Sequence, residues 1–213
     1  MRHHDLGYSP SEHVADAVVH VLGVVFAVAA ASALLTWAVL RVPADRIWAL
    51  VPYAAGLVAT FAFSAAYNMT LHTRIRAVLR RFDHAAIYVM IAGTYTPMAL
   101  IGLGGGRGFA LAIAAWSLAG LGIVLKLAWF PRWPRLGFAL YLAQGWLGLL
   151  AAWPMIQSLP PVALVLILAG GVTYTFGTLF HHGRMRYATA IWHGHVLAAA
   201  VAHYIAVILV AGA

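Results

Sequence analysis

The most constraining feature of this sequence is a series of seven long apolar stretches separated by short polar connections. A helix needs about 20 predominantly apolar residues to cross the hydrocarbon core of a bilayer. The stretches that meet this requirement are residues 14–40, 47–69, 82–103, 108–130, 136–156, 161–182 and 189–212. Because the connections leave no room for a second domain, the sequence predicts a single all-α membrane domain over residues 1–213, a seven-helix transmembrane bundle.

The charge distribution supports a membrane protein rather than a nucleic-acid-binding one. Charged residues make up only 8% of the chain, against about 25% in a soluble domain. The formal charge of +8 would suggest nucleic acid only if the basic residues shared a soluble face. They lie instead in the connections, so we expect membrane lipids as partners and no nucleic acid. No protein partner can be named.

The basic residues also predict an orientation, because short connections rich in arginine stay in the cytoplasm. On the side of the N-terminus lie Arg2, Arg74, Arg76, Arg80, Arg81, Arg132, Arg135, Arg184 and Arg186. On the opposite side lie Arg41, Arg46 and Arg107. Nine against three predicts a cytoplasmic N-terminus, an outside C-terminus and a multi-pass protein of the bacterial inner membrane.

Residues 64–97 contain the most unusual combination of features in the chain. The second apolar stretch ends there, a connection with four arginines follows, and Asp83 stands at the start of the third stretch. A carboxylate near hydrocarbon is costly unless a partner, water or a metal replaces its hydration. Asp83 is therefore a candidate functional residue. Gly93 with Pro97, and Gly145 in the fifth stretch, predict breaks in their helices.

Several polar residues are spaced four apart, which places them on one face of a helix. With the predicted topology they all fall near the cytoplasmic end of their helices: Glu12, Asp16 and His20, then Ser64 and Asn68, then Thr189 and His193. Together with Asp83 they predict a polar cavity that faces the cytoplasm. The alternative is a set of hydrogen bonds that only ties the helices together.

Motifs spread over all seven stretches resemble the hemolysin III family of bacteria, a branch of the progestin and adipoQ receptor superfamily. They are SEHVADAVVHVLG at 11–23, S-x-x-Y at 64–67, LRRFDHAAIYVMIAGTYTP at 79–97, Lys126, YLAQGW at 141–146, GGVTYTFG at 170–177 and AIWH at 190–193. The resemblance implies a seven-helix receptor-like bundle with its N-terminus inside. It also implies a zinc site near the cytoplasmic end, with ceramidase-like hydrolysis as the suspected chemistry.

The resemblance places three histidine ligands in S-x-x-x-H and H-x-x-x-H motifs, and the chain departs from both. Asn68 and Thr189 occupy two of the ligand positions, so only His193 is retained, with Ser64 and Asp83 nearby. Zinc prefers imidazole, thiolate or carboxylate ligands, and the chain has no cysteine. We therefore expect zinc to bind weakly or not at all. Asp16 replaces the amide usual in the family, which is either compensation or drift.

Four functional hypotheses follow. The first is a hemolysin III-type protein of membrane lipid homeostasis or signalling with a degenerate zinc site. The second is a metal-dependent hydrolase of a lipid amide or ester. In it His193 and Asp83, with Glu12 or Asp16, hold the metal; Asp83 and Ser64 are the candidate catalytic residues, Ser64 as a hydrogen-bond donor. The third is a pore-forming hemolysin, which the uniformly apolar stretches disfavour. The fourth is an ion transporter, for which the far half of the bundle offers few polar groups.

Overall fold

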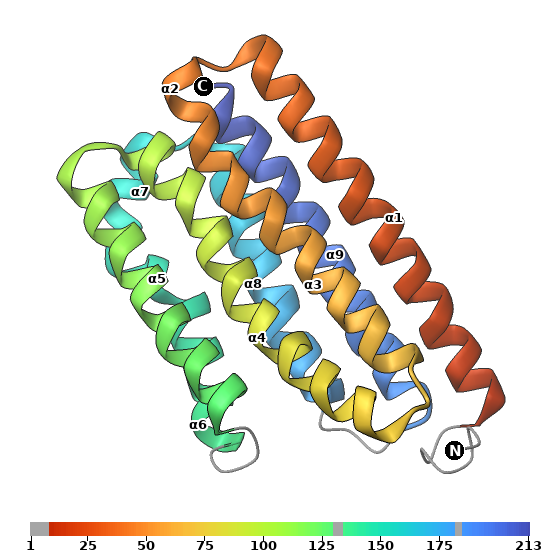
Figure 1. Cartoon of the computed structure of the whole chain (residues 1–213). Coiled ribbons are helices and arrows are strands. Elements are labelled where there is room, and N and C mark those ends of the chain that lie inside the picture. The colour runs from red at the N-terminus through yellow and green to blue at the C-terminus, as the bar shows by residue number, and fades with distance from the viewer. Residues whose placement is uncertain (1–8, 130–133, 182–184) are drawn as a thin grey trace.

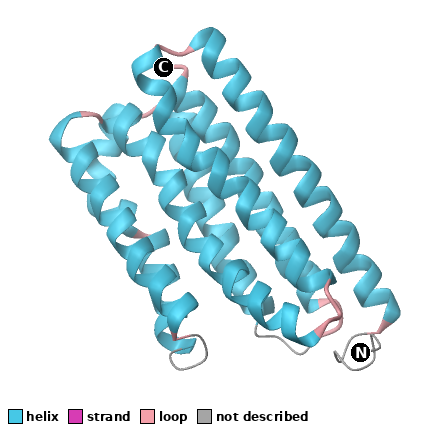
Figure 2. Cartoon of the chain, in the orientation of Figure 1, coloured by secondary structure: helices cyan, strands magenta, loops and turns pink. Residues whose placement is uncertain are grey.

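The structure, a computed structural model, describes residues 9–129, 134–181 and 185–213. Within these ranges all regular elements are helical (Figure 2). Seven helical segments are long and apolar enough to cross a membrane, which confirms the predicted fold class. They lie side by side in one bundle, and the start of α1 and the end of α9 lie at its opposite ends (Figure 1).

Each span corresponds to one element or to a short series of elements. The first span is α1 (Pro10–Arg41), the fourth is α5 (Gly105–Ala128), the sixth is α8 (Pro161–His181) and the seventh is α9 (Ala188–Ala211). The second combines α2 (Ala44–Ile47), η2 (Trp48–Leu50) and α3 (Val51–Met69). The third combines α4 (Thr73–Pro97) with the π-helix η3 (Met98–Leu103). The fifth combines α6 (Pro134–Gly145), η4 (Leu147–Ala151) and α7 (Ala152–Ser158).

The spans form a closed ring in which most helices pack on their neighbours in sequence. α3 packs on α4 and α8 on α9, while α1 closes the ring by packing on both α3 and α9. The fifth span contacts α4 and α5 through α6, but it meets α8 through α7. Small residues permit the closest approaches: a Cβ on Gly93 would lie 2.6 Å from the carbonyl oxygen of Pro52. Gly93 is therefore a packing position inside α4, and the predicted interruption occurs only at Pro97, after which the π-helix η3 begins.

The basic stretch before Asp83, predicted to be a connection between spans, is helical. The His72 side chain accepts a hydrogen bond from the Ile75 N–H and caps the start of α4. Arg76 donates to the carbonyl oxygen of Tyr67 over 3.1 Å and stacks on the Tyr67 ring. Arginine, leucine and alanine are good helix formers, so the helix starts at Thr73 and Asp83 lies well inside it.

The break predicted at Gly145 is confirmed, because α6 ends there and a 3-10 turn follows. The hydroxyl of Tyr95 bridges the break by donating to the Gly145 carbonyl (2.9 Å) and accepting from the Gly148 N–H (2.7 Å). Beside it, Gln144 donates to the carbonyl oxygens of Tyr88 and Ala115. Tyr95 of α4 thus satisfies backbone groups next to the interruption, as a protein in lipid requires, and Gln144 ties the end of α6 to α4 and α5.

Candidate functional site: a polar-ended cavity with a buried Asp–His–His group

A cavity of about 550 Å³ lies inside the bundle, lined by all spans except the fourth. A set of polar lining residues gathers at the end where α1, α4 and α9 begin and α3 ends: His20, Ser64, Asn68, Asp83, Thr189 and His193. Farther along, apolar residues such as Met90, Met98, Leu142, Leu149 and Leu164 predominate, and the polar side chains among them include Tyr95, Tyr174 and His203. Of the polar residues that helical spacing assigned to one depth, these six border one shared cavity, whereas Glu12 and Asp16 are not among its lining residues.

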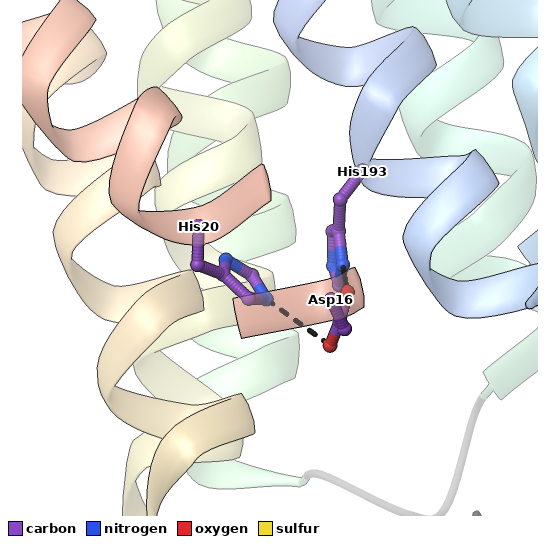
Figure 3. Close-up of side chains that lie close together, drawn as sticks. All are labelled: Asp16, His20 and His193. Carbon is purple, nitrogen blue, oxygen red and sulfur yellow. Dashed lines mark hydrogen bonds and ion pairs between the residues drawn. The ribbon is translucent and has the colours of Figure 1, made fainter. Parts of the chain in front are cut away.

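Three side chains form a compact group at this polar end: Asp16 and His20 from α1, and His193 from α9 (Figure 3). Oδ1 of Asp16 lies 2.7 Å from Nδ1 of His193, a short hydrogen bond. Oδ2 of Asp16 lies 3.4 Å from Nε2 of His20, and the two imidazole rings lie 4.2 Å apart between centroids. Asp16 and His20 are buried, with 7% and 3% of their surface exposed.

The group has the composition of a transition-metal site. Each residue offers one ligand atom, and these atoms lie within 4.8 Å of one another. Two imidazoles and one carboxylate form a common ligand set for catalytic zinc and for other first-row divalent ions. The ring nitrogen Nε2 of His20 is buried without a hydrogen bond in the described part of the chain. Since a buried polar atom without a partner is costly, this donor set fits a metal ion.

The two substituted family positions do not supply such ligands. The amide of Asn68 donates to the carbonyl oxygen of Ser64 in its own helix, over 3.0 Å. Thr189 borders the cavity with a hydroxyl, a poor zinc ligand compared with imidazole. The donor set therefore draws on α1 where the resemblance would draw on the second span and on the start of the seventh.

Glu12, predicted to share the cavity, has a different place. Its Oε1 accepts the backbone N–H of Tyr187 over 2.9 Å, directly before α9. Its Oε2 accepts hydrogen bonds from the N–H and hydroxyl of Ser9 in a capping box that starts α1. Glu12 therefore ties the first turn of α1 to the start of α9, and one turn further Asp16 makes the second tie, to His193.

Asp83 borders the cavity outside this three-residue group. Its Oδ2 lies 3.4 Å from Nδ1 of His84, and the carbonyl of His84 accepts a hydrogen bond from the Tyr141 hydroxyl. Of the described residues, only Asp16, His20 and His193 form a group with metal-ligand spacing. Asp16 was predicted as a possible replacement ligand, whereas His20 was predicted only as part of the polar cavity, although the Asp-x-x-x-His spacing places both on one face of the helix.

Seven apolar helices around a polar-ended cavity define a multi-pass integral membrane protein. The chain belongs to the haemolysin III family, because the model of that family, described as "Haemolysin-III related", matches residues 8–204. The "Hemolysin-3 homolog" of Bacillus subtilis (strain 168) is 33% identical over 94% of this chain and 95% of its own length. "Hemolysin-3" of Bacillus cereus is 32% identical over 87% of this chain and 85% of its own length. A human relative, "Monocyte to macrophage differentiation factor", is 26% identical over 94% of this chain and 85% of its own length.

Proposed function

We propose that this protein binds one membrane lipid in its cavity and acts in membrane lipid homeostasis. The observation that carries the proposal is that one cavity has a cluster of polar side chains at one end and a longer, mainly apolar part beyond it. Its volume of about 550 Å³ lies in the usual range of small-molecule sites, about 300–1,000 Å³. An acyl chain fits the apolar part, while the polar headgroup meets Asp83, His193 and the side chains around them.

The arginine distribution supports a cytoplasmic position for the polar end. The N-terminus and the connections between the second and third, fourth and fifth, and sixth and seventh spans carry the excess of basic residues. By the positive-inside rule this side faces the cytoplasm. The ligand would then enter with its headgroup toward the inner leaflet, where anionic lipids and basic residues attract each other.

A second candidate function is hydrolysis of a lipid amide or ester. The observation that favours it is the Asp16–His20–His193 group at the same end of the cavity as Asp83. A divalent ion held by the group would supply Lewis-acid chemistry to a carbonyl. The chain's own part would be orientation and proton transfer: Asp16 fixes the His193 ring through the 2.7 Å bond, and Asp83 accepts a proton.

The lipid proposal is tested by extracting the protein in mild detergent and identifying the co-purified lipids by mass spectrometry. Leu164 borders the apolar end of the cavity, whereas its neighbour Val165 is 66% exposed on the outer face of α8. Leu164→Trp should shorten the acyl chains that co-purify, because the larger ring occupies the apolar end. Val165→Trp is the matched control and should leave the lipid profile unchanged. Equal profiles for both variants would refute binding in this cavity.

The hydrolase candidate has a separate test. Purified protein in liposomes is supplied with a lipid amide or ester, and the released fatty acid is measured. Asp83→Asn should abolish the release while leaving the co-purified lipids in place, since the amide keeps the size of the side chain. Release that persists in Asp83→Asn would eliminate this mechanism. Leakage of an entrapped dye from the same liposomes would favour a pore.

A further inference from the structure

We infer that this protein holds a divalent transition-metal ion, zinc in the first place, between Asp16, His20 and His193, in a centre built mainly on the first span. The inference concerns metal binding alone and stands whether or not the cavity binds or hydrolyses a lipid. It replaces the expectation, drawn from Asn68 and Thr189, that zinc binds weakly or not at all.

The geometry of α1 and α9 brings the ligands together. Asp16 and His20 lie one helical turn apart, so their side chains project from the same face of α1. His193 projects toward both from the second turn of α9 (Figure 3). All three ligand atoms already lie within 4.8 Å of one another, so small side-chain rotations are enough to bring them onto one ion.

Hydrogen bonds at the starts of α1 and α9 hold the two helices together beside the group. The capping box of Ser9 and Glu12 fixes the start of α1, and the Glu12 bond to the Tyr187 N–H fixes α1 against the start of α9. Tyr187 has a positive φ of 61°, an uncommon conformation for a residue with a side chain. Metal sites bind tightly when such supports hold the ligands in position.

The buried surroundings of Asp16 and His20 favour a bound metal ion. The Asp16 carboxylate and the His20 ring are buried, and Nε2 of His20 lacks a hydrogen bond among the described residues. A divalent ion would satisfy that nitrogen and neutralise the carboxylate together.

A shared proton is the competing occupant of the same three residues. Asp16 and His193 alone make the short hydrogen bond, so a proton-bridged pair needs no contribution from His20. A metal centre needs all three side chains and an ion. Direct coordination of an ion by His20 would therefore distinguish a metal centre from a proton-bridged Asp16–His193 pair.

The first experiment measures zinc binding to the full chain in detergent after removal of metal with a chelator. The protein carries a histidine-free affinity tag and the changes His3→Gln and His4→Gln, which remove tail ligands. Equilibrium dialysis should give one zinc ion per chain. Asp16→Asn, His20→Gln and His193→Gln should each weaken binding by roughly 100-fold or more, since losing even an outer-shell partner costs about 10–100-fold. Folding of each variant is checked by size-exclusion chromatography and circular dichroism.

The second experiment makes coordination visible directly. The chain has no cysteine, so His20→Cys introduces a single sulfur. X-ray absorption of the zinc-loaded variant should show one sulfur neighbour at about 2.3 Å beside nitrogen and oxygen at about 2.0–2.2 Å. The matched control is His195→Cys, because His195 bonds the Ile191 carbonyl on α9 and is outside the group; its zinc should show no sulfur.

Three results would overturn the inference. One is a folded protein that takes up no zinc at micromolar free metal. Another is zinc binding that Asp16→Asn and His193→Gln leave unchanged, which would place the ion elsewhere. The last is zinc in His20→Cys without a sulfur neighbour. None of these results bears on the lipid profile of Leu164→Trp, so failure here and failure of the proposed function are distinguishable.

Discussion

The bond between Asp16 and His193 joins the first and last spans, and its strength can be predicted. The Asp16 carboxylate accepts from the imidazole over 2.7 Å, and both side chains are largely buried, with 10% and 12% of their surface exposed. A hydrogen bond that involves a charged group contributes about 1.5–3 kcal/mol. Hydrogen bonds between helices of one measured membrane bundle averaged only about 0.6 kcal/mol. Because this bond is short and includes a carboxylate, we expect a coupling energy of about 1.5–3 kcal/mol.

A double-mutant cycle on the metal-free protein measures that coupling. Asp16→Asn, His193→Gln and the double variant are unfolded in mixed micelles with increasing sodium dodecyl sulfate, and circular dichroism follows the loss of helix. The coupling is the part of the two single effects that does not add. Asp16→Asn with His195→Gln is the control cycle, since His195 bonds the Ile191 carbonyl and should add to Asp16 within about 0.5 kcal/mol. An equally small value for Asp16 with His193 would refute the reasoning.

The same cycle extends to zinc. An ion that binds the folded chain alone stabilises it by about 2.7 kcal/mol at a free concentration of 100 times Kd. Wild-type protein should gain about this amount when zinc is added, and Asp16→Asn should gain little. A zinc-dependent gain of equal size in both proteins would contradict a role for the carboxylate as a ligand.

Two further predictions concern packing and the family ligand positions. Gly93→Ala should destabilise the bundle by about 1–3 kcal/mol, because its Cβ would meet a backbone carbonyl oxygen at 2.6 Å. Gly120→Ala should instead stabilise the bundle by about 0.5–1 kcal/mol, because a Cβ there meets nothing within 4 Å. The same unfolding assay measures both variants. In an Asp16→Asn background, Asn68→His with Thr189→His should restore zinc binding measured by equilibrium dialysis, because both positions border the cavity beside His193. No recovery in a folded variant would show that the second span cannot reach the ion.

The number and order of the helices could be predicted because each span is a run of apolar residues long enough for a bilayer, a property of the local sequence. The break at Gly145 was also predictable from the local sequence, because glycine has a low helix propensity. The start of α4 was predicted wrongly, because the arginines of residues 74–81 interrupt hydropathy without interrupting helix propensity. Hydropathy marks where a helix enters lipid, and the helix itself extends beyond that point.

The candidate site was only partly predictable. Spacing four residues apart placed Asp16 and His20 on one face of α1, but it does not say which helix that face meets. The packing of α1 on α9 decides this, and a single sequence carries no direct record of such a contact. The contact brings Asp16 and His20 to His193 and leaves Glu12 with a structural tie to Tyr187.

Charge explains why a carboxylate can stand in for one of three imidazoles, while His20 supplies a second imidazole beside His193. Three neutral histidines, which the family resemblance implies, leave both charges of a zinc ion to be balanced from outside the ligand set, with Asp83 as the nearest implied acid. Asp16 brings one negative charge into the set itself, so a bound divalent ion leaves a net charge of one in a region where burying charge is costly. Asp83 is then not needed as a counter-charge, in keeping with its position beside His84. An Asp83→Asn change should accordingly leave zinc affinity nearly unaffected, whereas it would weaken a centre built from histidines alone.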